Sequence, residues 1–356
     1  MTVTTPQLDR GALMRAEIAE QPEALARLLD GGTDPIRRVA AAVRARAPRF
    51  VLLAGRGTSD HAALYAKYLL EIRLGLPCGL VSPSTLTGYG ATPDLAGVLW
   101  IVVSQSGGSP DLVESTAAAR KLGAITVAVT NAPASDLAAA AEFHVDVLAG
   151  PEHAVAATKS YTSQLLALYL LVDALAGGDG AAARSLPERV ATVLAAGDTV
   201  ATCAQRYRFV DRLIVTGRGY AYPTAREGAL KLMETSYLAA HAFSAADLLH
   251  GPLAMIDADR PVIAVAAEGV GATALEPVLD RLHERAADVL LIADAPLLAR
   301  WGGRRSTVEL ALPAVAEEVA PVVQIVPLQL LALTLAVARG GDPDAPRGLA
   351  KVTRTF

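Results

Sequence analysis

The sequence contains an internal repeat, and this repeat constrains the fold more than any other feature. Residues 51–57 (VLLAGRG) match residues 213–219 (LIVTGRG) at an offset of 162 positions. The next apolar segment keeps the offset, because the glycines that close it, Gly107 and Gly269, are also 162 positions apart. A repeat of this length predicts two copies of one domain-sized unit.

Each copy alternates short aliphatic runs with helical stretches. Residues 98–103 (VLWIVV) are apolar at every position, which is typical of a strand buried on both faces of a parallel sheet. Strand–helix alternation predicts right-handed βαβ crossovers. We therefore expect an α/β fold with two tandem doubly wound, three-layer αβα domains, each built on a parallel sheet.

Proline and glycine clusters between the periodic segments predict the domain boundaries. We expect an N-terminal helical segment over residues 1–34, a first domain over 35–180, a helical linker over 181–205, a second domain over 206–340 and a tail over 341–356.

Composition excludes several classes of protein. The chain has 32 Lys and Arg against 36 Asp and Glu, so it lacks the basic excess that nucleic-acid binding requires. Cys78 and Cys203 form no CxxC pair, which argues against a disulfide framework or structural zinc. The first twenty residues lack an apolar signal region, and a cytoplasmic location is expected. Residues 319–338 carry no formal charge, but their two prolines and two glutamines predict a buried core helix rather than a membrane span.

A serine- and glycine-rich loop follows the second apolar strand of the first copy. Ser104, Gln105, Ser106 and Ser109 stand where the strand gives way to a helix, the end of a parallel sheet at which ligands bind. Backbone N–H groups at such a turn favour an anion. No lysine follows the glycines, so a phosphate monoester fits better than a nucleoside triphosphate. The alternative is a turn whose hydroxyls only cap the helix.

The loop after the first strand of this copy also carries hydroxyl groups. Gly57 precedes Thr58 and Ser59, which are placed to contact sugar hydroxyls across the same crevice. His61 falls within the following helix and is expected on its surface. The corresponding loops of the second copy lack the Thr–Ser pair and the serines, so the second copy must contribute a different kind of group.

That group is predicted on a helix of the second copy. Glu227, Lys231 and Glu234 are spaced i, i+4 and i+7, which places them on one helical face. The alternative is a solvated Glu–Lys pair on a surface helix. Further on, His250 precedes a Gly-Pro pair where a helix must stop, which makes it the strongest candidate among the six histidines. No HExxH motif or carboxylate–histidine cluster predicts a metal, and no cofactor is expected.

Together these residues resemble the sugar-isomerase (SIS) domain family, in the tandem arrangement of the isomerase half of glucosamine-6-phosphate synthase. The matching segments cover the chain in the family's order: GRGTSDHAALYAKYLLE (55–71), SQSGGSPDLV (104–113), AVAATKSYTSQ (154–164), EGALKLMETSYLAAHAFSAADLLHGPLAMID (227–257) and PRGLAKVT (346–353).

The resemblance implies a site for a phosphosugar and a role for each matching residue. Substrate and phosphate binding are implied for Gly57, Thr58, Ser59, Ser104, Gln105, Ser106, Gly107, Ser109, Ala156 and Ala157. Glu234 would transfer the proton, with Glu227 and Lys231 beside it. His250 would open the sugar ring from the neighbouring subunit of a homodimer, and Lys351 would form an imine with the ketose.

The sequence also departs from the synthase pattern. Ala157 replaces a sugar-contacting serine, and Gly108 replaces the usual acidic residue of the serine loop. Residue 2 is Thr rather than a cysteine nucleophile, so glutamine hydrolysis, and hence the synthase reaction, is not expected of this chain. These departures resemble those of stand-alone members, which include amino-sugar 6-phosphate deaminases and deglycases.

The resemblance implies a hexosamine 6-phosphate as substrate, and the residue types at the site are those that could transfer protons on it. His250 would assist ring opening, and a partly desolvated Glu234 would take the C2 proton. Hydrolysis of the resulting ketimine gives glucosamine-6-phosphate deaminase chemistry. Loss of the C3 hydroxyl of the N-acetylated sugar would instead give a dehydratase, and a deglycase or plain aldose–ketose isomerase also remains open. A non-catalytic sugar-phosphate sensor is the alternative of another class, although it would not need Glu234, His250 and Lys351.

Overall fold

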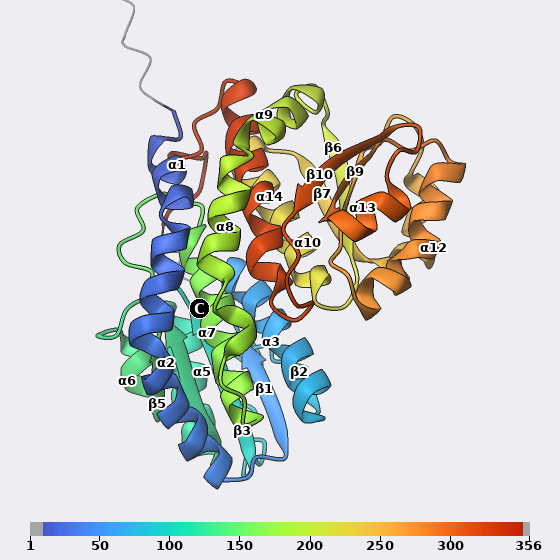
Figure 1. The fold of residues 1–356 in the computed structure, drawn as a ribbon. Coiled ribbons are helices and arrows are strands. Elements are labelled where there is room, and N and C mark those ends of the chain that lie inside the picture. Colours follow the sequence, from blue (N-terminus) through green and yellow to red (C-terminus); the bar gives the residue numbers. More distant parts are fainter. Residues whose placement is uncertain (1–9, 352–356) are drawn as a thin grey trace, which may run out of the picture.

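The computed structural model describes residues 10–351, and its two lobes are the two copies of the repeat (Figure 1). Residues 1–9 and 352–356, the outer ends of the predicted N-terminal segment and tail, lie outside the described residues. The first copy has five parallel strands in the order β2–β1–β3–β4–β5. They are β1 (Phe50–Ala54), β2 (Cys78–Leu80), β3 (Val98–Ser104), β4 (Ile125–Thr130) and β5 (Phe143–Asp146).

The second copy repeats this topology. Its strands are β6 (Arg212–Gly217), β7 (Ala239–Ser244), β8 (Val262–Val265), β9 (Val289–Asp294) and β10 (Thr307–Leu312). They are again parallel, in the order β10–β9–β8–β6–β7, which is the first sheet's order read from the other edge. The prediction of two tandem doubly wound domains is confirmed.

Helices cover both sheets. In the first copy they are α3 (Thr58–Leu74), α4 (Ser84–Thr87), α5 (Pro110–Lys121), α6 (Asp136–Ala140) and α7 (Lys159–Leu175). In the second they are α10 (Ala221–Ser236), α11 (Ala245–Leu249), η2 (Pro252–Met255), α12 (Val270–Glu284), α13 (Ala295–Trp301) and α14 (Ala320–Ala338). Two helices precede the first sheet, α1 (Ala12–Ala19) and α2 (Gln21–Ala45), and three short helices join the copies: η1 (Ala181–Ala183), α8 (Leu186–Ala195) and α9 (Gly197–Arg206). The boundary predicted at residue 35 falls inside α2, which continues through Pro35.

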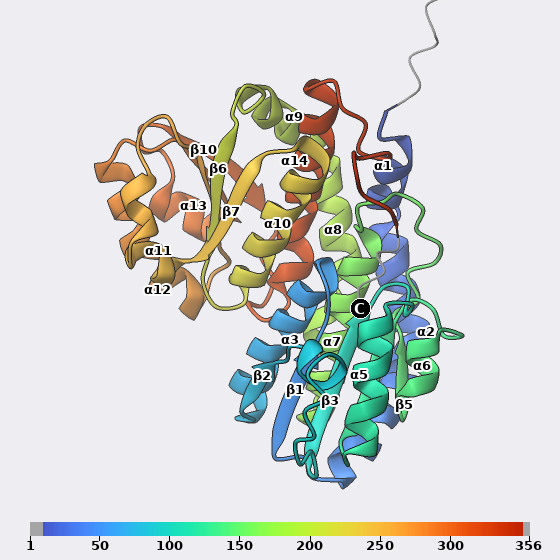
Figure 2. The ribbon, with the colours of Figure 1, turned by 180° about the vertical axis from the view of Figure 1, so that it is seen from behind.

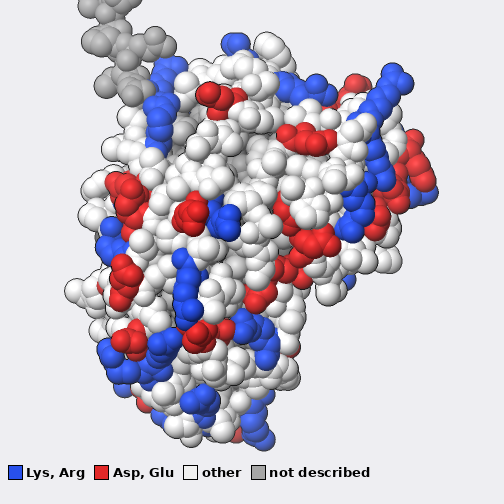
Figure 3. All heavy atoms as spheres, in the orientation of Figure 1, with Lys and Arg blue, Asp and Glu red and all other residues white. Residues whose placement is uncertain are grey.

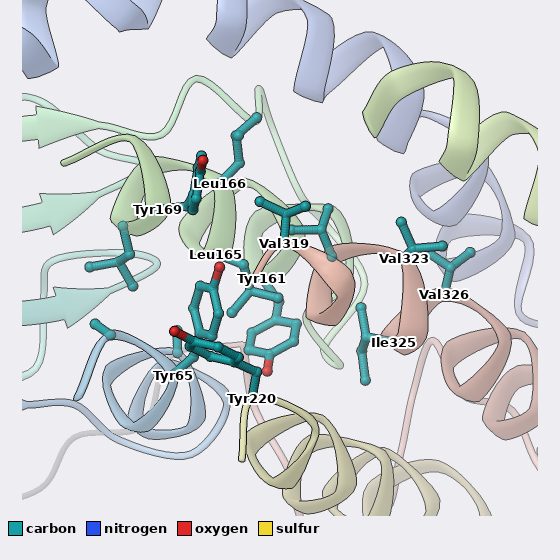
Figure 4. Close-up of a cluster of buried hydrophobic side chains, with 14 of the residues drawn as sticks. Tyr65, Tyr161, Leu165, Leu166, Tyr169, Tyr220, Val319, Val323, Ile325 and Val326 are labelled. Atoms are coloured by element: carbon teal, nitrogen blue, oxygen red, sulfur yellow. The ribbon is translucent and has the colours of Figure 1, made fainter. Parts of the chain in front are cut away.

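The two copies share one hydrophobic core. Its residues include Tyr65 of α3 and Tyr161 of α7 from the first copy, packed with Tyr220 and Val323 from the second (Figure 4). The uncharged helix α14 lies in this core, with 83% of its most apolar window buried, so the prediction of a core helix is confirmed. Positive and negative side chains are interspersed on the face shown in Figure 3.

The strand order places a crevice between β1 and β3. The next two strands along the chain, β2 and β3, lie on opposite sides of β1, and ligands bind beyond the carboxyl ends of the strands at such a switch point. Helices α3 and α5 begin there. Helix α10 of the second copy packs against α3, which begins at this end of the first sheet (Figure 2).

Candidate active site

A cavity of about 300 Å³ opens at this switch point and has walls from both copies. The first copy contributes the loops after β1 and β3, the second copy contributes helix α10, and the C-terminal tail closes one side. The lining residues are Arg56, Gly57, Thr58, Ser59, Val103, Ser104, Gln105, Ser106, Ser109, Leu112, Val155, Ala157, Lys231, Glu234, Leu349, Ala350 and Lys351.

The serine loop forms one wall of the cavity. The hydroxyl oxygens of Ser104 and Ser106 accept hydrogen bonds from the N–H groups of Gly107 (3.1 Å) and Gly108 (3.3 Å), which holds the turn. Ser109 occupies the N-cap position of α5, yet its side chain makes no capping hydrogen bond. Its hydroxyl therefore does not cap the helix. This favours the interpretation of the loop over residues 104–109 as an anion-binding cradle rather than a simple helix cap.

The turn requires glycine at position 107. Gly107 has a φ of 64°, and a Cβ atom there would lie 2.1 Å from the Ser135 hydroxyl oxygen. The close approach of the two loops thus fixes the position of the backbone that faces the cavity.

A cation that the sequence did not predict lies beside the serine loop. The Arg56 guanidinium pairs with Asp111 on α5, with Nη2 2.6 Å from a carboxylate oxygen and Nε donating to the same oxygen at 2.8 Å. Asp111 is buried, whereas Arg56 lines the cavity. The pair is neutral overall, but it holds the guanidinium, rather than the carboxylate, at the cavity.

Helix α10 presents a line of charges to the other side of the cavity. The Lys231 ammonium lies 3.4 Å from a Glu227 oxygen and 2.5 Å from a Glu234 oxygen. The Glu227 and Lys231 side chains are 0% and 1% exposed, so the alternative of a solvated surface pair is wrong. Glu234 is 23% exposed and lines the cavity, as expected of a partly desolvated carboxylate.

The charge state of Lys231 follows from its neighbours. Burial alone would lower the pKa of Lys231, but the carboxylates of Glu227 and Glu234 outweigh burial and raise this pKa above its ordinary value. Lys231 is therefore a permanent ammonium at neutral pH, and it can stabilise negative charge next to Glu234.

Residues of the first copy complete this charged group. The Thr58 hydroxyl donates to a Glu227 oxygen at 3.0 Å and accepts from Lys231 at 3.1 Å. His61 is buried, and its Nδ1 atom lies 2.8 Å from the other Glu227 oxygen. The expectation of a surface position for His61 is wrong, because the face of α3 that carries it packs against α10.

Ser59 is also bound within the protein. Its hydroxyl accepts a hydrogen bond from the Gln164 amide at 3.1 Å. Thr58 and Ser59 both line the cavity, but both hydroxyls already have protein partners, so their contact with a sugar stays a prediction.

The C-terminal tail brings Lys351 to the cavity. Its ammonium donates to a Glu152 carboxylate oxygen at 2.9 Å and to the Ala154 carbonyl at 2.6 Å. Burial would raise the pKa of Glu152, but Lys351 and the N–H groups of Ser160 and Thr158 outweigh it and hold this pKa below its ordinary value. The sequence motifs gave no signal for Glu152.

Four predicted residues do not line the cavity. Glu227, Gly107 and Ala156 are buried behind its walls, whereas His250 is exposed in the turn that follows α11. A single chain therefore does not bring His250 to the site. Among residues 10–351, no group of three or more His, Cys, Asp or Glu side chains could hold a metal ion.

Comparisons with known proteins agree with this architecture. The family model of the SIS domain matches residues 46–174 and 207–339. Glutamine–fructose-6-phosphate aminotransferase (isomerizing) of Pseudomonas putida is 35% identical over 364 residues, which cover 96% of this chain and 59% of that protein. The chain belongs to the SIS domain family, and it spans about three fifths of the length of that relative.

Solved structures show the same fold. The C-terminal domain of glucosamine-fructose-6-phosphate aminotransferase from Francisella tularensis superimposes with a TM-score of 0.83 at 28% identity, covering 94% of this chain and 98% of that one. Glucosamine-6-phosphate deaminase of Thermotoga maritima superimposes with a TM-score of 0.76 at 20% identity, and the alignment covers 97% of this chain and 100% of that one. An identity this low supports the fold alone.

Proposed function

We propose that this chain acts on hexosamine 6-phosphates and converts glucosamine 6-phosphate and water to fructose 6-phosphate and ammonia. The observation that carries the proposal is the shared cavity, in which the serine loop lies opposite a carboxylate flanked by an ammonium group. Its volume of about 300 Å³ lies at the small end of ligand pockets, which suits a single hexose phosphate.

The serine loop binds the phosphate in this proposal. The hydroxyls of Ser106 and Ser109 provide donors, and Arg56 places a guanidinium beside them. With the phosphate held there, the opposite end of the open-chain sugar reaches toward α10.

Glu234 acts as the base. It removes the C2 proton, made acidic by the C1 carbonyl, and returns a proton at C1, so that the C2 amine becomes a ketimine. Lys231 stabilises the oxyanion that develops between these steps, because its positive charge is fixed beside Glu234. Water then adds to C2, and ammonia leaves as the ketose forms.

We assign Lys351 to the carbonyl end of the sugar, where its amine forms an imine with the ketose. Lys351 lines the cavity and is oriented by Glu152 and the Ala154 carbonyl. Borohydride reduction in the presence of fructose 6-phosphate should leave a stable adduct on Lys351 that mass spectrometry can locate. An unmodified Lys351 after this treatment would contradict the imine.

His250 requires a second chain. We propose a homodimer in which the exposed His250 of one subunit enters the partner's cavity and moves a proton to the ring oxygen. Mixed dimers of Glu234→Gln and His250→Ala subunits should then recover part of the activity, because one of their two sites is intact. No recovery after subunit exchange would show that each chain holds a complete site.

Product analysis tests the reaction. Glucosamine 6-phosphate should yield stoichiometric ammonia and fructose 6-phosphate. An ultraviolet-absorbing enone from N-acetylglucosamine 6-phosphate would indicate dehydration instead, and C2 proton exchange without ammonia would indicate isomerisation. Tight binding without turnover, unchanged in Glu234→Gln, would contradict an enzyme and favour a sensor.

A further inference from the structure

We infer that His61 is a positioning residue, which through Glu227 and Lys231 fixes the cavity carboxylate of the second copy against the first copy. The inference rests on the proposed function, because it concerns the delivery of Glu234 to the sugar. His61 itself is absent from the residues that line the cavity.

The contact between His61 and Glu227 is buried and specific. Their side chains are 7% and 0% exposed, and Nδ1 lies 2.8 Å from Glu227 Oε2. A carboxylate oxygen only accepts hydrogen bonds, so the ring must carry its proton on Nδ1 and donate it. A buried carboxylate oxygen without a donor is costly, and His61 is the donor that the structure gives to Oε2.

The other Glu227 oxygen connects this contact to the cavity. Oε1 accepts from Thr58 at 3.0 Å and lies 3.4 Å from the Lys231 ammonium, which lies 2.5 Å from Glu234. Lys231 therefore stands between two carboxylates that compete for it. While His61 satisfies Oε2, the ammonium remains closer to Glu234.

Loss of His61 would change that balance. With Oε2 unpaired, Glu227 attracts Lys231 more strongly, and Glu234 loses the contact that fixes its orientation. The effect should appear in proton transfer rather than in phosphate binding, because the serine loop lies on other elements. The contact also joins α3 to α10, so it positions one copy's base relative to the other copy's anion cradle.

The second copy indicates that this contact is not a requirement of the fold. The position equivalent to His61, 162 residues later, is Pro223, and the position equivalent to Glu227 in the first copy is Tyr65. The same topology thus forms without a histidine–carboxylate pair.

The test compares three variants of His61 with a matched control. His61→Leu removes the donor, His61→Asn places an amide N–H near the Nδ1 position, and His61→Gln places one near the Nε2 position. The control, His144→Leu, removes another partly buried histidine. His144 lies on β5, an edge strand of the first sheet, and its Nε2 is 2.8 Å from the Thr130 hydroxyl. Exchange of the C2 proton of glucosamine 6-phosphate in D₂O, followed by NMR, gives kcat and KM for each.

We expect kcat of His61→Leu to fall about 10- to 100-fold with KM within about 2-fold of the wild type, since small misplacements of a catalytic group have effects of this size. His61→Asn should recover most of the loss, His61→Gln should not, and His144→Leu should match the wild type. If His61→Leu does not fold, the Asn–Gln contrast still decides.

Two results would overturn the inference separately from the proposed function. A wild type that exchanges the C2 proton, with Asn and Gln variants equal to each other, would show that the Nδ1 contact has no positioning role. A loss confined to KM would assign His61 to binding. A wild type that exchanges no proton on any hexose or hexosamine phosphate would overturn the proposed function itself, and this inference with it.

Discussion

At the start of the helix that follows the third strand, the two copies of the repeat fill the same space differently. In the first copy, the loop before α5 faces an open cavity. In the second, the Glu317 carboxylate accepts hydrogen bonds from the N–H groups of Val270 (3.1 Å) and Gly271 (2.8 Å) at the start of α12. A Cβ on Gly269 would lie 2.2 Å from that carboxylate, so the space is full. The chain's own anion thus occupies the position that a phosphate would take.

The counterpart of Glu317 in the first copy is Glu152, because Gln164 of α7 matches Gln329 of α14 at an offset of 165. Glu152 turns instead toward Lys351 and toward the N–H groups at the start of α7. One carboxylate position therefore closes the cradle of the second copy, whereas in the first it holds a lysine at the cavity and leaves the cradle open.

The helices that follow the first strand of each copy, α3 and α10, also differ, but here it is the second copy that carries the charged side chains. The positions equivalent to Glu227, Lys231 and Glu234 on α10 are occupied on α3 by apolar side chains and a tyrosine: Tyr65, Leu69 and Ile72. In the proposed mechanism, binding and proton transfer are thus divided between the copies, and this division predicts a single site for each chain.

The largest effect should come from Glu234→Gln, which removes the base but keeps the shape of the side chain. We expect kcat to fall about 10²- to 10⁴-fold with little change in KM, the usual contribution of a general base. Glu317→Gln makes the same chemical change in the other copy and should keep full activity. Equal losses of kcat in both variants, measured by ammonia release, would contradict the claim that only the second copy's α10 carries the base.

Glu152→Gln should lower stability as well as disturb the orientation of Lys351, because it leaves Lys351 without its buried partner. We expect the free energy of unfolding to fall by about 3 kcal/mol at pH 7. The pKa of Glu152 is lowered in the folded state, so its stabilisation is present above the ordinary glutamate pKa and is lost as the pH falls through the folded value. Denaturant titrations should show the difference between wild type and variant shrinking in acid. A constant difference would contradict the ion pair.

Ser106→Ala should weaken substrate binding. A hydrogen bond to a charged group contributes about 1.5 kcal/mol or more, so the Kd for glucosamine 6-phosphate should rise about 10-fold. Thr273→Ala removes a hydroxyl from α12 of the second copy, and calorimetry should find its Kd unchanged. An unchanged Kd in Ser106→Ala would place the phosphate elsewhere.

Glu317→Gln should have the smallest effect. It weakens an anionic contact at a helix N-terminus and should lower the free energy of unfolding by about 1 kcal/mol. A Glu317→Ala protein would test the same position further, because it removes the side chain that fills the space beside Gly269. If phosphate ion stabilised that protein in thermal melts but not the wild type, the contrast between a filled and an open site would be supported directly.

The sequence predicted the repeat, the two parallel sheets and the serine loop of the cavity, because those features follow simple rules: offset, apolar runs and the ends of strands. Ala157 and Lys351 were expected at the cavity only from the family resemblance. The sequence did not predict that His61 is buried. The helical pattern of α3 does not reveal which face meets α10, and that depends on how the copies pack. The contact between Glu152 and Lys351 joins residues 199 positions apart, for which spacing gives no signal. Arg56 belongs to a loop that the sequence singled out, but only the structure shows that its guanidinium pairs with Asp111.

The most direct test is a crystal structure of the Glu234→Gln protein with glucosamine 6-phosphate. We predict the phosphate within hydrogen-bond distance of Ser106 and Ser109 in the first copy, and C2 of the same molecule about 3–4 Å from the side chain at position 234 of the second. A sugar bound with its phosphate at the start of α12, or with C2 out of reach of α10, would contradict a site shared between the two copies.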